Sequence, residues 1–268
     1  MHSQKKHSYL ETLIMGELSE IVKDLNLPKQ ILDKSESLIK TLFGPSFDEL
    51  GGMISDQIKL RRFKNQLTIF TKAQEILKEK NIDPKKVSLK VLAPLIELSS
   101  YEEEESLQQK WAQLTAHVIV NNSDTIFQQN CINILNKISN EESVFLDKLY
   151  SLLQEKQILI QEKNSLMAKK YPELFKSKVG KPLLAYELKF GINEVSRKFG
   201  LSNNDLDFQL SNLIALSLLN WDTIVEVNAE KSDEDPEDKD INVDVDVSNY
   251  DTFVFTSLGL KFVEVCKG

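Results

Sequence analysis

Hydrophobic residues recur every three to four positions from residue 8 to about residue 160, which is the spacing of amphipathic helices. Breaks at Gly, Pro and Asn divide this pattern into seven predicted helices, over residues 8–25, 30–43, 46–80, 87–98, 102–120, 125–138 and 139–163. Leu107, Trp111 and Leu114 lie on one face of the fifth, so we predict that Trp111 belongs to the core. Ser99 and Ser100 are predicted to cap this helix, with Glu102–Glu105 in its first turn.

The pattern changes after Tyr171, where a Lys-rich connector with Pro and Gly begins. Two further helices are predicted over residues 184–199 and 206–219, followed by strands over 223–228 and 243–255 and a final helix through Cys266. This order is typical of a winged-helix module. We therefore predict a mainly α fold, in which a helical bundle is followed by a winged-helix-like module with a small two-stranded β wing.

The predicted helices and strands divide the chain into three parts. An N-terminal helical region covers residues 1–44, the helical bundle covers 45–140, and the winged-helix-like module covers 141–268 with an acidic wing loop at 230–246.

Composition narrows the class of protein. The chain has 268 residues, 41% of them hydrophobic and 28% charged, which is typical of a soluble globular protein of about two domains. Its net charge of −8 argues against a general nucleic-acid coat, because a polyanion would be repelled. No apolar run approaches the roughly 20 residues that a membrane span needs, and the N-terminus lacks an apolar signal region. Since Cys131 and Cys266 indicate reduced thiols, we expect a cytoplasmic protein without a membrane span.

The acidic loop is the most charged segment. Residues 230–246 hold nine carboxylates and two lysines, a net charge of −7. Asp238, Asp240, Asn242 and Asp244 alternate as in a calcium-binding loop, but Val243 stands where that loop needs Gly. A solvated wing tip is the favoured interpretation, and we predict no metal ion and no cofactor.

The predicted recognition helix has the wrong charge for DNA. In winged-helix proteins this helix enters the major groove with basic and amide side chains. Residues 201–230 contain no Lys or Arg and several carboxylates, among them Asp205 and Asp207. This charge argues against nucleic-acid binding through this module, and a protein contact or a structural role is favoured.

One polar cluster lies on the long helix predicted from residue 46. Its members are Asp56, Gln57, Arg61, Arg62 and Asn65, within three helical turns. The chain has only three arginines, so an adjacent pair is unusual, and guanidinium groups suit bidentate contacts with carboxylate or phosphate. We favour an internal role, in which Arg61 pairs with Asp56 or with one of Glu102–Glu105 and braces the bundle. Binding of a ligand or partner is the alternative.

Catalysis finds little support. His2, His7 and His117 form no metal-ligand spacing with one another or with the cysteines. No phosphate-binding loop, dinucleotide fingerprint or nucleophile elbow occurs. The Gly51–Gly52 pair allows a hinge or a membrane-active hairpin, but close helix packing is preferred, since carboxylates and amides surround it. We expect no enzymatic activity.

Several segments together resemble the abortive infection alpha (Abi-alpha) family over about residues 40–265. They are Leu42–Gly52, Asp56–Ile58, Arg61–Asn65, Pro94–Glu97, Ser99–Glu103, Leu107–Leu114, Leu218–Trp221 and Phe255–Phe262. The resemblance implies a helical core and a role in bacterial defence against phage, in which an infected cell stops supporting phage growth. It implies no catalytic residues.

The sequence therefore predicts a non-enzymatic anti-phage protein of the abortive infection type that acts through protein contacts or self-association. Two alternatives stay open. One is a winged-helix regulator that binds nucleic acid, and the other is an effector that perturbs membranes.

Overall fold

A computed structural model describes residues 57–121, 124–181, 188–231 and 241–267. The chain divides into two compact units, one formed by residues 1–140 with 264–268 and the other by residues 141–263. The predicted helices over 8–25 and 30–43 lie outside the described residues, so the three-part division of the chain stays a prediction. The described residues are mainly helical with one small antiparallel sheet, which confirms the predicted fold class.

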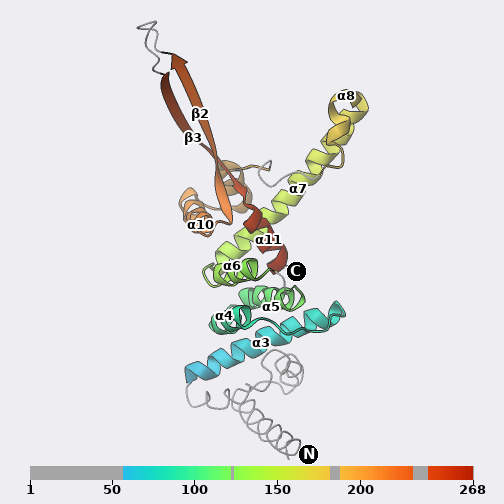
Figure 1. The fold of residues 1–268 in the computed structure, drawn as a ribbon, viewed down its shortest axis with the longest axis vertical. Coiled ribbons are helices and arrows are strands. Elements are labelled where there is room, and N and C mark those ends of the chain that lie inside the picture. The colour runs from blue at the N-terminus through green and yellow to red at the C-terminus, as the bar shows by residue number, and fades with distance from the viewer. Residues whose placement is uncertain (1–56, 122–123, 182–187, 232–240, 268) are drawn as a thin grey trace, which may run out of the picture. The chain divides into compact units, whose positions relative to one another are not determined.

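Four helices form the described part of the first unit (Figure 1). They are α3 (Gln57–Glu79), α4 (Leu89–Ser99), α5 (Glu105–Val120) and α6 (Thr125–Leu135). Helix α5 packs against α3 and α6, and α4 packs against α3 and α6. Trp111 of α5 is 1% exposed, as predicted for a core residue. Phe70 of α3 and Leu95 of α4 are also buried, so the core lies where these helices meet.

The predicted cap of α5 is wrong. The helix begins at Glu105 with Glu104 as its N-cap, so Glu102–Glu104 precede it. The Ser100 hydroxyl instead donates to the Glu97 carbonyl at 2.6 Å and so serves the C-terminal end of α4. The reason is that only a short turn joins α4 to α5, so Ser99 and Ser100 lie at the end of α4 and too far from the start of α5 to cap it.

The second unit begins with a long helix and ends with a sheet and a helix (Figure 1). In chain order its elements are α7 (Asn140–Lys170), α8 (Pro172–Phe175), η2 (Lys176–Lys178), β1 (Phe190–Gly191), α9 (Ile192–Phe199), α10 (Asn203–Ala215), β2 (Leu219–Lys231), β3 (Ile241–Phe255) and α11 (Ser257–Lys267). The last four residues of α11 belong to the first unit.

The sheet has three strands in the order β1-β3-β2, all antiparallel: the two predicted strands pair as β2 and β3, and β1 is a short addition that was not predicted. Strand β1 was missed because it has two residues, too few for an alternating pattern. Phe190, predicted to be helical, pairs with Phe253 of β3. Its ring lies 5.7 Å from that of Phe253 and 6.0 Å from that of Phe255, and these buried aromatic rings form the core of the sheet.

Helices α9 and α10 form a helix-turn-helix beside this sheet. Gly200 ends α9 with a φ of +68°, a conformation that favours glycine, and the Ser202 hydroxyl accepts a hydrogen bond from the Asp205 N–H to cap α10. The Phe145 ring of α7 meets the Phe199 ring of α9 edge to face at 5.7 Å. This arrangement is compatible with a winged helix.

The acidic segment is not wholly a loop. Residues 230–231 belong to β2 and residues 241–246 to β3, and residues 232–240 lie outside the described part of the chain. Glu226 pairs in register with Asp246, and Val225 with Val247. Alternating valines, which favour strands, extend the β2–β3 ribbon despite the acidic residues between them.

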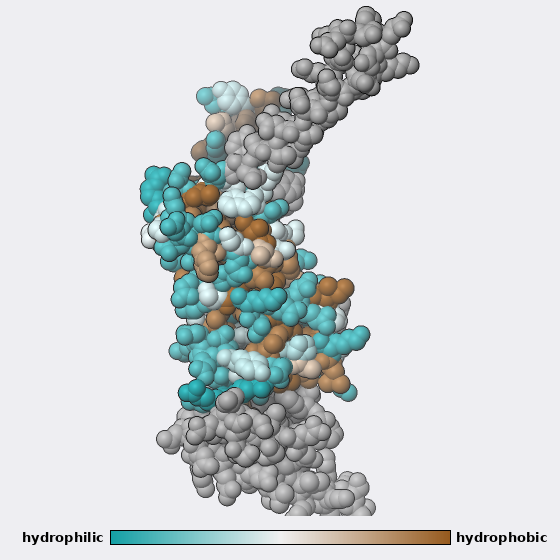
Figure 2. Space-filling model, turned by 90° about the vertical axis from the view of Figure 1, so that its left-hand side faces the viewer, coloured by the Kyte–Doolittle hydropathy of each residue, from teal (hydrophilic) through white to brown (hydrophobic). Residues whose placement is uncertain are grey.

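Hydrophobic residues on the surface lie in small patches. Figure 2 shows such patches among hydrophilic residues on one face of the molecule, as is usual for a globular protein. Within the described ranges, every helix is too short or too polar to cross a lipid bilayer.

Candidate functional site

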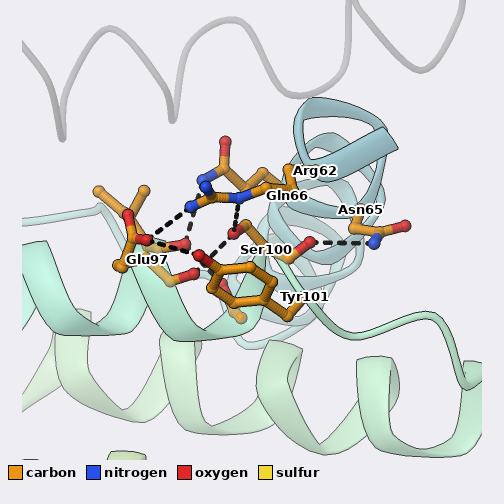
Figure 3. Close-up of polar contacts among 8 residues, drawn as sticks. Arg62, Asn65, Gln66, Glu97, Ser100 and Tyr101 are labelled. Carbon is orange, nitrogen blue, oxygen red and sulfur yellow. Dashed lines mark hydrogen bonds and ion pairs between the residues drawn. The ribbon is translucent and has the colours of Figure 1, made fainter. Parts of the chain in front are cut away.

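Arg62 stands at the centre of a polar clamp between α3 and the C-terminal end of α4 (Figure 3). Its Nε donates to the Ser100 hydroxyl at 2.9 Å, and its Nη2 donates to the Glu97 carboxylate at 2.7 Å. The guanidinium also lies over the Tyr101 ring, 4.2 Å from its centre. The Tyr101 hydroxyl donates to the same Glu97 oxygen at 3.0 Å. Arg62 therefore contacts three side chains of this clamp, those of Glu97, Ser100 and Tyr101.

Two amides extend the clamp to the backbone (Figure 3). Asn65 Nδ2 donates to the Ser100 carbonyl, and Gln66 Nε2 donates to the Ile96 carbonyl, each at 3.0 Å. Both donors bind carbonyls at the C-terminal end of α4, and the positive charge of Arg62 suits the negative end of the helix dipole. The clamp therefore holds α3 and α4 together.

Arg61 faces a different environment. Its side chain is 76% exposed, and its ion pair with Glu103 is long, at 3.8 Å, with Glu103 itself 64% exposed. Such pairs contribute little to stability. Glu103 is one of the glutamates, Glu102–Glu105, that were predicted as partners of Arg61. The contacts that can brace the bundle, however, are made by Arg62.

The structure thus separates the predicted site residues. Arg62 and Asn65 meet in the clamp, Arg61 points away from it, Gln57 is the first residue of α3, and Asp56 lies outside the described residues. Sequence reasoning did not place Gln66, Glu97, Ser100 or Tyr101 in this site. A signal was present, because Arg61–Asn65, Pro94–Glu97 and Ser99–Glu103 all belong to the segments that carry the family resemblance.

A second candidate surface lies on α10, the helix in the position of a recognition helix. Phe208 is 77% exposed, although Leu206 and Leu210 on the same helix are buried. Asn204, Asp207 and Ser211 share its exposed face, and no Lys or Arg occurs on α10. An aromatic ring among carboxylates and amides suits a protein surface with apolar and basic groups better than a phosphate backbone.

Polar contacts fix this helix-turn-helix on α7. Asn212 of α10 donates to the buried Glu142 carboxylate at 2.6 Å. Lys156 of α7 pairs with Glu194 of α9 at 2.7 Å, and Lys198 of α9 pairs with Glu155 of α7. The helix that carries Phe208 is therefore tied to α7 directly through Asn212 and indirectly through its neighbour α9.

Four titratable groups among the described residues have clearly shifted pKa values. Burial is the main cause that raises the pKa of Glu102 and lowers the pKa of His117, and it raises the pKa of Cys131 to about 12. The Lys189 ammonium, 2.6 Å away, holds the pKa of the Asp222 carboxyl below its usual range. In the described ranges no three His, Cys, Asp or Glu residues lie close enough to hold a metal ion. The absence of enzymatic activity stays a prediction.

Comparison with known proteins identifies a family. The model of the family described as abortive infection alpha matches residues 55–266, a range that includes the clamp and α10. Neither a curated protein nor a solved structure matches the chain. The family description associates the chain with abortive infection, in agreement with the resemblance read from the sequence. The chain belongs to the abortive infection alpha family.

Proposed function

We propose that this chain is an anti-phage protein of the abortive infection type that acts by contacting another protein and catalyses no reaction. The family match over residues 55–266 carries the defence role. The exposed face of α10 supports the contact mechanism, because it presents the Phe208 ring next to carboxylates on a helix that is tied to α7.

Phe208 is the central contact of this proposal. An aromatic side chain that is 77% exposed loses most of its contact with water when a partner covers it, and such residues often dominate interface energetics. Asp205 and Asp207 flank it, so the partner is expected to present Lys or Arg around an apolar pocket. The same carboxylates oppose the counterion release that drives DNA binding.

The test is phage plating on a bacterial host that carries the wild-type gene, the Phe208→Ala gene or no gene. We expect wild type to lower plaque numbers at least about tenfold while infected cells still die, and Phe208→Ala to restore most plaques. Truncation of a strong interface residue costs about 2 kcal/mol or more, which is over tenfold in affinity for the partner.

Ile126→Ala is the matched control, because Ile126 is 74% exposed on α6, far from α10 in the sequence. Both variants must keep the wild-type melting temperature and cellular amount. Protection by Phe208→Ala equal to that of wild type would contradict the α10 contact, and unchanged plating by wild type over a broad phage panel would contradict the defence role.

Two measurements on the purified protein separate the alternatives. Retention on DNA that falls with salt would favour the nucleic-acid-binding regulator. Dye leakage from liposomes would favour the membrane-perturbing effector. His117→Gln should leave protection unchanged, since the proposal gives no role to a general base.

A further inference from the structure

The packing of α7 ends halfway along the helix. Its buried hydrophobic residues are Phe145, Leu146, Leu149, Leu152 and Leu153. No described residue of α7 after Leu153 is buried. In Figure 1 the second half of α7 extends away from the rest of its unit and carries α8 at its end.

The hydrophobic face of α7 nevertheless continues into this second half. One row of residues seven apart runs Phe145, Leu152, Leu159, Leu166, and its neighbour runs Leu146, Leu153, Ile160, Met167. Residues seven apart lie on the same face of a helix. Leu152 is buried, whereas Leu159 is 64% and Leu166 is 66% exposed. The same stripe therefore fills a core at one end and meets solvent at the other.

Hydrophobic exposure continues beyond the helix end. Leu174 of α8 is 67% exposed, and Tyr171 and Val179 on either side of it are also exposed. The Nζ atoms of Lys170 and Lys178 lie 5.2 and 5.3 Å from the ring centres of Tyr171 and Phe175. Apolar surface and ammonium groups are thus interleaved over α8 and η2.

Residues 157–181, which we call the basic tip, differ in charge from the rest of the chain. Their six lysines and two glutamates give a net charge of +4, so the remainder of a chain of −8 carries −12. The lysines are Lys163, Lys169, Lys170, Lys176, Lys178 and Lys181. A cluster of this size next to exposed apolar side chains is typical of segments that bind anionic lipid surfaces.

The position of the lysines decides between possible occupants. Lys163 and Lys170 lie seven residues apart between the two hydrophobic rows. A second copy of the helix packed on this stripe would bring its lysines close to these, and like charges there are destabilising. An anionic membrane accommodates both features, since headgroup phosphates pair with the ammonium groups while the apolar side chains enter the boundary with the acyl chains.

We propose that the basic tip binds the surface of membranes that contain anionic lipids, with Leu166 and Leu174 as apolar contacts and Lys169, Lys170 and Lys176 as phosphate contacts. The helix lies on the surface and does not span the bilayer. The proposal does not depend on the defence role or on the α10 contact. The remaining negative charge of the chain keeps its other surfaces away from the lipid.

The test is co-sedimentation of the full chain with phosphatidylcholine vesicles that contain or lack phosphatidylglycerol. We expect retention on the phosphatidylglycerol vesicles and release at high salt, where charges are screened beyond about 3 Å. Lys169→Gln with Lys170→Gln and Lys176→Gln should weaken binding about a hundredfold. That is about fivefold per lysine, the equivalent of about 1 kcal/mol.

The matched control replaces Lys85, Lys90 and Lys137 by Gln, because these lysines are exposed in the first unit and the change in net charge is the same. A second pair of variants separates charge from apolar contact. Leu166→Ser with Leu174→Ser should also lose binding, while Leu89→Ser with Ile126→Ser, equally exposed in the first unit, should retain it.

Three results would overturn the proposal. They are no retention of wild type on phosphatidylglycerol vesicles, equal loss for the tip and control lysine variants, and lipid-free oligomers in sedimentation velocity that the tip variants dissociate. The last result would assign the stripe to a protein interface. Retention that the tip variants lose and the controls keep supports the membrane contact.

Discussion

Replacement of Arg62 by Ala tests the clamp between α3 and α4 most directly. The change removes the 2.9 Å bond to the Ser100 hydroxyl, the 2.7 Å bond to Glu97 and the contact with the Tyr101 ring. A hydrogen bond from a charged group contributes about 1.5–3 kcal/mol where it is shielded, and Ser100 is fully buried. Exposure of Glu97 and Tyr101 limits their two contacts to roughly 1 kcal/mol together. We expect a loss of about 3 kcal/mol in the free energy of unfolding.

Urea unfolding followed by tryptophan fluorescence measures this loss. In a Trp221→Phe background the signal comes from Trp111, which lies in the core of the clamped unit. With a slope of about 1–3 kcal/mol per molar urea, the midpoint should fall by about 1–3 M. Arg62→Lys should fall between Ala and wild type, because an ammonium group cannot reach both acceptors in the fixed geometry of a guanidinium.

Arg61→Ala is the matched control, since it removes the neighbouring charge and leaves the clamp intact. Its free energy of unfolding should stay within about 0.5 kcal/mol of wild type, because the pair with Glu103 is long and exposed. Equal destabilisation by Arg61→Ala and Arg62→Ala would contradict the conclusion that Arg62 holds α3 and α4 together.

Three further changes have defined outcomes. Gly259→Ala should cost about 1–3 kcal/mol in thermal unfolding, because a Cβ there would clash with the Leu218 carbonyl oxygen and lie 2.8 Å from its carbon. Gly191→Ala should be nearly neutral, because a Cβ there would meet only the Glu194 Cβ at an ordinary contact distance of 3.8 Å. Burial lowers the pKa of His117 below 6.5, so its contribution to stability is present above pH 6.5 and is lost as pH falls. Urea midpoints across this range should therefore decline less for His117→Gln than for wild type. Cys131, with its pKa raised to about 12, should react with a thiol reagent in a Cys266→Ser background only at the rate of unfolding, and fast labelling of the folded protein would contradict its burial.

Helical periodicity predicted most of the described fold, because long amphipathic segments carry a repeated signal. Trp111 could be assigned to the core from its spacing with Leu107 and Leu114, and the structure confirms it. Strand β1 could not be predicted, since two residues show no period and its pairing with β3 joins positions more than 60 residues apart in the chain.

The clamp was only partly visible in the sequence. An adjacent arginine pair drew attention to the correct turn of α3, but neighbours on a helix point about 100° apart, and the sequence does not say which one faces α4. Glu97 and Ser100 are 35 and 38 residues from Arg62, and side-chain bonds across such distances leave no local pattern. The absence of basic residues on α10, by contrast, needed only the sequence.

Because only the first half of α7 is packed, the length of the helix depends on a local equilibrium between helix and coil. None of the 14 residues from Gln157 to Lys170 is buried, so this stretch relies on the packed half as a nucleus and on its own helix propensity. Helices of this length are marginal alone, and they fray from the free end as temperature rises. Because each helical residue adds about 1.5 Å, fraying of this stretch changes the length of the helical part of α7 by up to about 20 Å. Amide hydrogen exchange should therefore become steadily faster along α7, from its packed half towards Lys170.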